Sequence, residues 1–229
     1  MSYLLALDQG TTSSRALVVD GAGSILGMEQ QEFPQLLPRS GEVEHDPEAI
    51  WSSQLDTARR VLHSGSIGSE QIRAIGITNQ RETTILWERS TGRPVANAMV
   101  WQSRASVPIC QRLLQEGVED WVREKTGLVI DPYFSGTKIR HLFDQNPDLQ
   151  RRAERGELAF GTVDSFLIWR LTGGRCHVTD VSNASRTLLM NLKTLQWDAE
   201  LLKLLDLPIE LMPKICLLYT SDAADDRLR

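Results

Sequence analysis

Two short polar segments contain the residue types that could bind a phosphate group and a polyol. The first, Asp-Gln-Gly-Thr-Thr-Ser-Ser-Arg at residues 8–15, follows the apolar run Tyr3–Leu7. A hairpin of this composition can present backbone N–H groups and hydroxyls to phosphate oxygens. Gly10 permits close approach, and Asp8 can hold Mg²⁺ through water. The segment lacks the glycine spacing and the lysine of a Walker A loop. Asp-x-Gly-Thr is also ordinary hairpin sequence, so both interpretations stay open at this point.

The second segment is the pair Arg81-Glu82, a few residues after the apolar run Ile72–Ile77. A guanidinium donates hydrogen bonds to hydroxyls and a carboxylate accepts them, so together they could orient a polyol. Taken alone, the pair favours an ion pair on the protein surface over a polyol site.

The elements that must position these segments follow from the periodicity of apolar residues. Residues 3–7, 16–19 and 24–31 predict a meander of three antiparallel strands. Asp46, Pro47 and Glu48 predict the start of a crossover helix, with Asp46 as its N-cap. Further strands are predicted at 72–77 and 83–87, and helices at 104–116, 119–125, 137–145, 165–171 and 197–205. We expect Asp164 to cap the helix over 165–171.

Composition restricts the class of protein. The chain has 229 residues, of which 41% are hydrophobic, enough for one sizeable core and, by default, one large domain. The net charge is -5 and charges of both signs are interspersed, so no footprint for nucleic acid or an anionic membrane is visible. No signal peptide and no apolar run of bilayer-spanning length occur, which predicts a cytoplasmic protein. Cys110, Cys176 and Cys216 are expected to be free thiols.

Beyond the first two segments, several blocks together resemble the N-terminal domain of the FGGY carbohydrate kinases, in the form found in members that phosphorylate glycerol. The blocks occur in family order and with family-like spacing between residues 4 and 213. They are residues 7–15, 75–84, 100–102, 127–138, 161–164, 177–180 and 183–187. The resemblance implies an α/β, ribonuclease-H-like fold of the actin, hexokinase and heat-shock ATPase type, a mixed sheet with helices on both faces.

The resemblance also assigns roles to residues. The family's substrate-binding positions match Arg81, Glu82, Trp101 and Tyr133, where the aromatic side chains form the wall of a glycerol pocket. Its nucleotide-binding positions match Thr11, Thr12, Ser13 and Arg15, which join Asp8 and Gly10 as predicted nucleotide-binding residues. The implied ligands are glycerol, ATP or ADP, and Mg²⁺ at Asp8. His45 and Asp180 are instead expected to organise a turn and a loop.

The resemblance covers an N-terminal domain at residues 1–215 and predicts that the parent protein is longer. Residues 216–229 lose amphipathic character and are expected to be a non-native tail. In the family, a second domain supplies the adenine pocket and an aspartate, followed by glutamine, that acts as general base. No such Gly-Asp-Gln block occurs in this sequence.

We therefore expect the full-length parent, a homo-oligomer, to phosphorylate glycerol to sn-glycerol 3-phosphate. Three alternatives stay open: another FGGY sugar or polyol kinase, a non-catalytic glycerol-binding fragment, and, more distantly, an actin-like or heat-shock-type ATPase.

Overall fold

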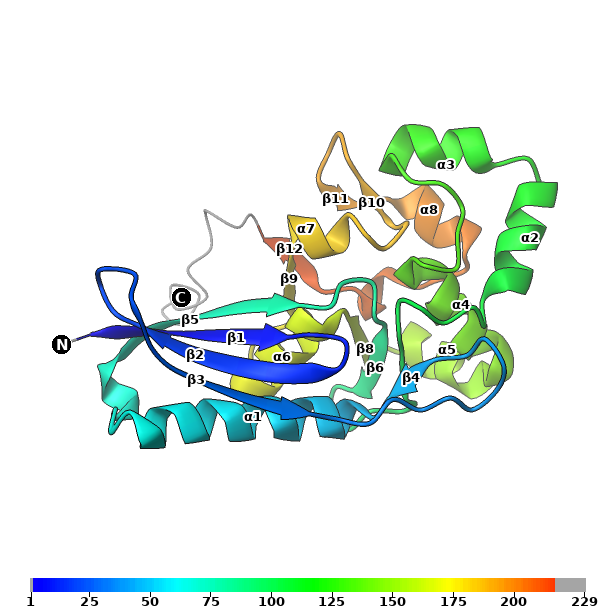
Figure 1. Cartoon of the computed structure of the whole chain (residues 1–229). Helices are drawn as coiled ribbons and strands as arrows, with labels where there is room; N and C mark the ends of the chain where they lie inside the picture. The colour runs from blue at the N-terminus through cyan, green and yellow to red at the C-terminus, as the bar shows by residue number, and fades with distance from the viewer. Residues whose placement is uncertain (1, 217–229) are drawn as a thin grey trace. The chain divides into compact units, whose positions relative to one another are not determined.

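The computed structural model describes residues 2–216, which divide into two compact units (Figure 1). Unit 1 comprises residues 2–36 and 45–80, and unit 2 comprises residues 37–44 and 81–216. Each unit has its own hydrophobic core. The prediction of one kinase domain over residues 1–215 stays a prediction. The expected non-native tail lies outside the described residues, apart from Cys216.

Unit 1 is a mixed four-stranded sheet with one long helix. Its elements are β1 (Tyr3–Gln9), β2 (Ser13–Val19), β3 (Ile25–Glu32), α1 (Pro47–Ser64), the short 3-10 helix η1 (Ser69–Gln71) and β5 (Ile72–Asn79). The strand order is β3-β2-β1-β5, with β1, β2 and β3 antiparallel and β5 parallel to β1. The predicted meander and crossover helix are confirmed.

Helix α1 packs on the sheet because apolar residues recur on one side of each element. Leu5 and Leu7 in β1 and Val18 in β2 are buried against Ala58 and Val61 of the helix. This packing holds in place the two strands, β1 and β2, that flank the connecting turn.

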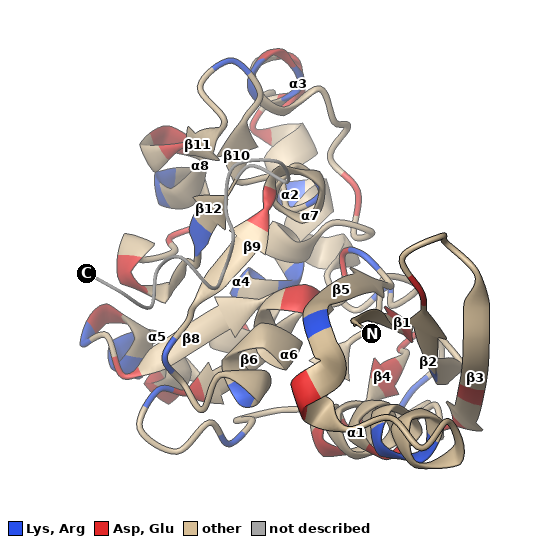
Figure 2. Ribbon diagram, turned by 90° about the vertical axis from the view of Figure 1, so that its left-hand side faces the viewer, with Lys and Arg blue, Asp and Glu red and all other residues tan. Residues whose placement is uncertain are grey.

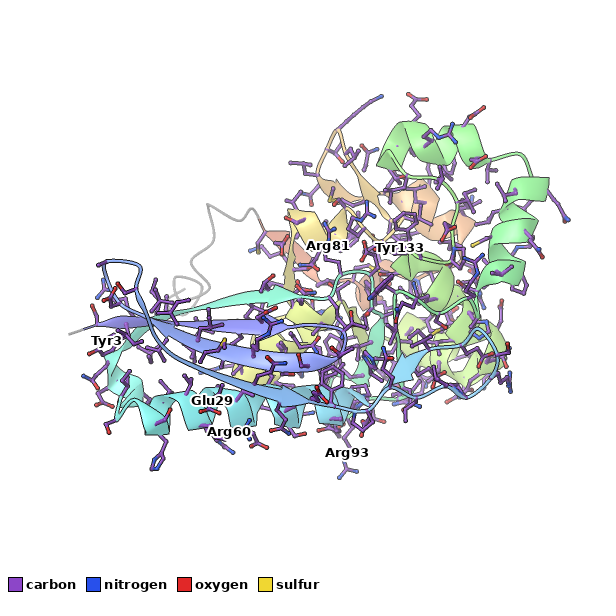
Figure 3. All side chains as sticks on the ribbon, viewed as in Figure 1. Tyr3, Glu29, Arg60, Arg81, Arg93 and Tyr133 are labelled. Atoms are coloured by element: carbon purple, nitrogen blue, oxygen red, sulfur yellow. The ribbon has the colours of Figure 1, made fainter. Side chains whose placement is uncertain are left out.

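Polar contacts also connect α1 with β2 and β3. The hydroxyls of Ser14 and Ser53 lie 2.8 Å apart, and Gln54 donates to the Arg15 carbonyl at 2.8 Å. At the outer strand, Arg60 pairs with Glu29 at 3.5 Å; both residues are labelled in Figure 3. The helix therefore supports the strand that follows the predicted phosphate turn.

The start of α1 agrees with its predicted cap. The Asp46 carboxylate accepts from the Glu48 amide at 2.9 Å, and Pro47 occupies the first turn. Figure 2 shows both basic and acidic residues on α1 and on α5 of unit 2.

Unit 2 is built mainly from short helices around a large apolar core. Its helices are α2 (Val107–Gln115), α3 (Glu119–Thr126), α4 (Ser135–Gln145), α5 (Pro147–Glu154), α6 (Val163–Leu171), α7 (Val181–Ala184), α8 (Ala199–Leu204) and the 3-10 helix η2 (Ile209–Leu211). Its strands are β6 (Ile85–Glu88), β7 (Ala98–Met99), β8 (Leu158–Gly161), β9 (Val178–Asp180), β10 (Met190–Asn191), β11 (Gln196–Trp197) and β12 (Lys214–Cys216). Strand β4 (Glu44–His45) crosses the boundary between the two ranges.

Strands in unit 2 form small ladders, with β6 antiparallel to β8 and β9 parallel to β12. The core gathers residues from α2 to α8, among them Phe143, Phe160 and Leu189, all essentially without exposure. All three cysteines are free thiols. Among residues 2–216, no helix has both the length and the apolar character needed to cross a bilayer.

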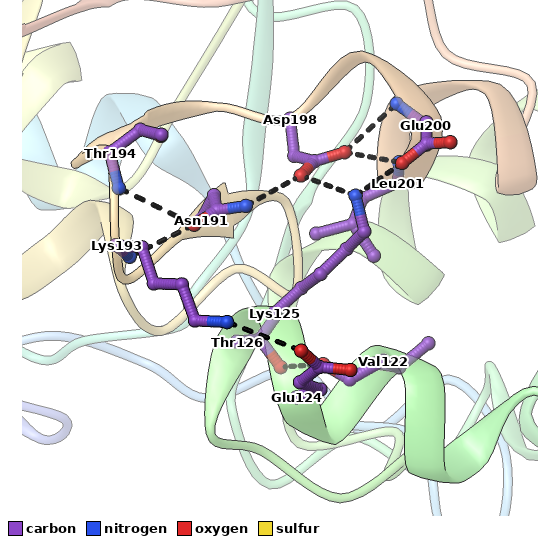
Figure 4. A network of polar contacts seen from close by, with 10 residues as sticks. All are labelled: Val122, Glu124, Lys125, Thr126, Asn191, Lys193, Thr194, Asp198, Glu200 and Leu201. Carbon is purple, nitrogen blue, oxygen red and sulfur yellow. Dashed lines mark hydrogen bonds and ion pairs between the residues drawn. The ribbon is translucent and has the colours of Figure 1, made fainter.

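A polar network fixes the beginning of α8 (Figure 4). Asp198 accepts from the amides of Glu200 and Leu201, from Asn191 at 2.9 Å and from Lys125 at 2.8 Å. Burial alone would raise the pKa of Asp198, but the hydrogen bonds from Lys125 and Asn191 lower it to about 2. This network joins α3 to α8.

The expected N-cap role of Asp164 is wrong. Thr162 occupies the N-cap position, and Asp164 lies inside the first turn of α6, where its carboxylate accepts from Thr162 and, at 2.7 Å, from Thr179. Burial raises the pKa of Asp164 to about 6, although both hydroxyls oppose the shift. The helix begins two residues earlier than predicted because Val163, Phe166 and Leu167 are all buried.

The raised pKa of Asp164 has a consequence for stability. Because the folded state retains the proton up to about pH 6, this group should destabilise the fold as pH rises from about 4 to 6, by about 3 kcal/mol in total. The variant Asp164→Asn, which cannot ionise, should lack this decline. Urea unfolding of both chains between pH 4 and 7 measures it, and parallel curves would contradict the expectation.

Candidate functional site

The predicted phosphate segment forms a tight turn between β1 and β2 in unit 1. The Gly10 amide donates to the Ser13 carbonyl at 2.9 Å, which closes the turn. A Cβ atom at Gly10 would lie 3.2 Å from that same oxygen, so glycine suits the close approach. Phe33 donates to the Thr12 carbonyl at 3.3 Å. Thr12 is exposed and Thr11 half-buried at the tip.

The charged residues of this segment face each other across the hairpin. Asp8 and Arg15 are direct partners in the ladder, and their side chains approach at 3.5 Å while remaining partly exposed. The Ser13 hydroxyl accepts from Gln30 of β3 at 3.1 Å, so it also helps to hold the sheet edge. All six predicted nucleotide-binding residues thus lie at one end of the unit 1 sheet.

The segment over residues 8–15 contains one carboxylate, that of Asp8 near the end of β1. Across residues 2–216, no three His, Cys, Asp or Glu side chains gather in a way that could hold a metal ion by themselves. A single partly exposed carboxylate beside hydroxyls suits a hydrated Mg²⁺ that binds together with a nucleotide, rather than a resident metal.

Gln80 contacts the predicted phosphate segment, and the sequence interpretation gave it no role. Its side-chain amide donates to Gln9 at 3.0 Å and to the Gly10 carbonyl at 3.2 Å, and its backbone amide donates to the Gln9 carbonyl at 2.7 Å. It thereby attaches the phosphate turn to the end of β5, immediately before Arg81. In the sequence, the indication of this role was the position of Gln80 between Asn79 and Arg81.

His45 contributes to the same buried network. Its Nδ1 lies 3.4 Å from the Gln80 amide nitrogen, and its ring meets Phe33 edge-on at 5.0 Å. Burial lowers the pKa of His45 to about 4, so the imidazole is neutral at pH 7. The expectation that His45 organises a turn is wrong, because His45 lies buried in strand β4 and Asp46 caps α1. The loop-structuring role expected for Asp180 is confirmed, since Asp180 caps α7.

In unit 2, Glu82 has an unusual backbone conformation with φ of 62°. Its carbonyl accepts from Thr84 at 3.2 Å and from Ser135 at 3.0 Å, which holds this conformation in place. Non-glycine residues in the left-handed region are uncommon and cluster at functional sites. The backbone is thus held in an unfavourable conformation at a predicted ligand-binding position.

The side chains of Arg81 and Glu82 lie in different surroundings. Arg81 is exposed, and Figure 3 labels it on unit 2, as it does Tyr133. Glu82 is 2% exposed, and its carboxylate accepts from the Arg186 guanidinium at 2.7 Å. The alternative of a surface ion pair between Arg81 and Glu82 is therefore wrong. Arg186 lay within a block that matched the family but had no predicted role.

The two predicted aromatic residues meet as a wall. The rings of Trp101 and Tyr133 lie 5.5 Å apart in an edge arrangement, and the Trp101 amide donates to Thr83 at 3.3 Å, next to Glu82. They line a pocket of about 260 Å³. The remaining lining residues are Gln102, Ser103, Arg104, Asp131 and Pro132.

Lys138 supports this wall from inside the protein. Its ammonium donates to the carbonyls of Pro132 at 2.8 Å, of Phe134 at 3.4 Å and of Tyr133. Burial lowers the pKa of Lys138 to about 7, while the nearby Glu82 opposes the shift. The four predicted substrate-binding residues all belong to unit 2, and the buried Lys138 stabilises the loop that carries Tyr133.

Comparison with known proteins finds relatives along almost the whole chain. The profile described as the N-terminal domain of the FGGY family of carbohydrate kinases matches residues 3–222. A glycerol kinase of Ralstonia nicotianae is 61% identical over 215 residues, which are 94% of this chain and 43% of that protein. A glycerol kinase of Escherichia coli is 56% identical over 213 residues, 93% of this chain and 42% of that protein.

Solved structures agree on the fold. The glycerol kinase of Plasmodium falciparum with ADP superposes with a TM-score of 0.87 at 33% identity, covering 94% of this chain and 43% of that one. A xylulose kinase of Lactobacillus acidophilus gives a TM-score of 0.82 at 26% identity, covering 94% of this chain and 42% of that one. The predicted ribonuclease-H-like α/β fold of the actin and hexokinase type is confirmed.

The extent of the match defines what this chain is. It spans less than half the length of these relatives. Since the profile of the N-terminal domain covers most of its residues, the chain belongs to the FGGY family of carbohydrate kinases.

Proposed function

We propose that the full-length protein transfers the γ-phosphoryl group of ATP to glycerol, giving sn-glycerol 3-phosphate and ADP. The observation that carries this proposal is an arrangement in unit 2: Arg186 holds the buried Glu82 carboxylate and also contacts Tyr133, which forms a wall with Trp101. The 61% identity to a glycerol kinase supports glycerol as the acceptor.

Within this site, each residue has a separate task. Glu82 accepts hydrogen bonds from hydroxyls of glycerol, and the exposed Arg81 donates to them. Trp101 and Tyr133 pack against the carbon chain. One hydroxyl then remains free to accept the phosphoryl group.

The turn of unit 1 binds the nucleotide phosphates. Gly10 permits close approach, and the amides and hydroxyls of Thr11, Thr12 and Ser13 donate to phosphate oxygens, with Arg15 as a further cation. Asp8 would hold Mg²⁺ through water, and the ion would supply neutralisation of the phosphate charge. The general base belongs to the part of the full-length protein that follows residue 215. Cytoplasmic location and homo-oligomerisation of that protein stay predictions.

A fusion protein tests the proposal. Residues 1–215 of this chain, joined to the remaining part of the Ralstonia nicotianae relative, should phosphorylate glycerol with MgATP. The 229-residue chain alone should show no turnover, because removing the base alone lowers a rate about 10²- to 10⁴-fold and cleft closure is lost as well. The assay couples ADP formation to NADH oxidation.

The second candidate is phosphorylation of a longer polyol or a sugar, which the likeness to a xylulose kinase favours. A folded fusion that phosphorylates xylulose but leaves glycerol unchanged would establish this candidate instead. Robust glycerol phosphorylation by the isolated chain would disprove the assignment of the base to the missing part.

A further inference from the structure

Arg186 connects two parts of the polyol site that are far apart in the sequence. It follows α7, and its Nε lies 2.7 Å from Oε1 of Glu82, which is 104 residues earlier. The glutamate is 2% exposed and the arginine 28%. A carboxylate this deeply buried requires a counter-charge, and Arg186 supplies it directly.

The same guanidinium also contacts the aromatic wall. It lies 4.9 Å from the ring centre of Phe134 and 5.8 Å from that of Tyr133. Arginine suits both tasks, because its planar group can stack on a ring while its N–H groups point at a carboxylate. Lysine carries the same charge but has no planar group that could stack on a ring.

The backbone around Arg186 is held firmly. Asp180 caps α7 through the amides of Ser182 and Asn183, and the Arg186 amide donates to the Asn183 carbonyl at 3.0 Å. This anchors the turn from its N-terminal side.

On the other side of Arg186, the turn is attached to α4. The Thr187 carbonyl accepts from the Gly136 amide at 2.7 Å. A Cβ atom at Gly136 would come within 2.8 Å of that oxygen, so this approach depends on glycine. Helix α4 begins directly after Tyr133 and Phe134, which places the turn and the wall on one framework.

We propose that Arg186 is a positioning residue for polyol phosphorylation. It holds Oε1 of Glu82 and thereby directs Oε2 toward a substrate hydroxyl, while its stacked guanidinium fixes Tyr133 against the carbon chain. No proton moves to or from Arg186. The inference rests on the proposed function, since it assigns the support of the same acceptor carboxylate.

The test uses the fusion protein with Arg186→Met and Arg186→Lys. The methionine variant should raise KM for glycerol about 10- to 100-fold, the effect of losing one charge-assisted hydrogen bond and its orientation. KM for ATP should change less than about 2-fold, because the nucleotide-binding residues belong to unit 1. The lysine variant should fall between the wild type and methionine, since it keeps only the charge.

A purely structural role would give another result. It would lower the yield and thermal midpoint of Arg186→Met but leave KM for glycerol unchanged in the folded fraction. Arg170→Met is the matched control, because Arg170 also stacks on a phenylalanine, Phe166, at 5.6 Å. This control should leave KM for glycerol within about 2-fold.

A double-mutant cycle keeps the test decisive if Arg186→Met folds poorly. The variants Arg186→Lys, Glu82→Gln and their combination should be strongly non-additive in kcat/KM for glycerol. Additive effects, or an unchanged KM for glycerol, would overturn the inference while the proposed function stands. If the unmodified fusion phosphorylates other acceptors but not glycerol, the proposed function fails, and the same cycle on the accepted substrate decides the role of Arg186.

Discussion

Replacing Glu82 with glutamine in the fusion protein is expected to lower kcat/KM for glycerol about 10²- to 10³-fold. The amide cannot neutralise Arg186, whose guanidinium now lies 2.7 Å from the carboxylate, and it offers one acceptor oxygen in place of two. A substrate hydroxyl that loses its buried acceptor is left poorly paired. A site built to hydrogen-bond that hydroxyl then acts on the substrate much less efficiently. Steady-state kinetics with glycerol and ATP varied separately measure the loss.

The control for this variant is Glu124→Gln. Glu124 is 71% exposed and pairs with Lys193 at 3.2 Å on the surface. Such pairs contribute little, so kcat/KM for glycerol should stay within about 2-fold. If Glu82→Gln retained the activity of the control, the carboxylate would have no part in binding the acceptor.

The elements of unit 1 could be predicted because each depends on local information. Short apolar runs identified β1 and β2, and the turn sequence between them was interpreted correctly. The sequence Asp46-Pro47 marked the start of α1. The same logic would have found α5, which was overlooked: Asn146 accepts from the Asp148 amide at 3.2 Å, and Pro147 follows it.

Long-range packing decided the features that were predicted wrongly or missed. Asp164 has the residue type of an N-cap, but the apolar residues around it draw the whole first turn of α6 into the core. Its carboxylate is then satisfied by Thr162 and Thr179 instead. Local preference was overridden by burial.

The site shows the same division. Arg81, Glu82, Trp101 and Tyr133 could be chosen by resemblance, since each stands within a matching block. The partner of Glu82 could not, because no rule of spacing links it to an arginine 104 residues later. The positive φ of Glu82 was also hidden, since glutamate has no particular preference for that conformation.

Replacing Lys138 with methionine is expected to destabilise the 229-residue chain by about 3 to 5 kcal/mol. The side chain of Lys138 is fully buried, and methionine would leave the carbonyls of Pro132, Tyr133 and Phe134 without their donor. The loop that carries Tyr133 should loosen as a result. Urea unfolding followed by circular dichroism measures the difference in free energy.

The pH dependence gives a second measurement on the same pair of proteins. The folded-state pKa of Lys138, about 7, lies below its usual 10.5, so between these values the unfolded chain binds more protons. Lys138 should therefore stabilise the fold increasingly as pH rises from 7 to 10. The difference in free energy of unfolding between wild type and Lys138→Met should widen over this range. Lys193→Met, at a lysine that is 73% exposed, should change stability by less than about 0.5 kcal/mol at every pH. A difference in free energy of unfolding that stays constant with pH would mean that the carbonyls keep Lys138 charged in the fold across this range. Equal free energies of unfolding for wild type and Lys138→Met would mean that the carbonyls do not need the Lys138 donor.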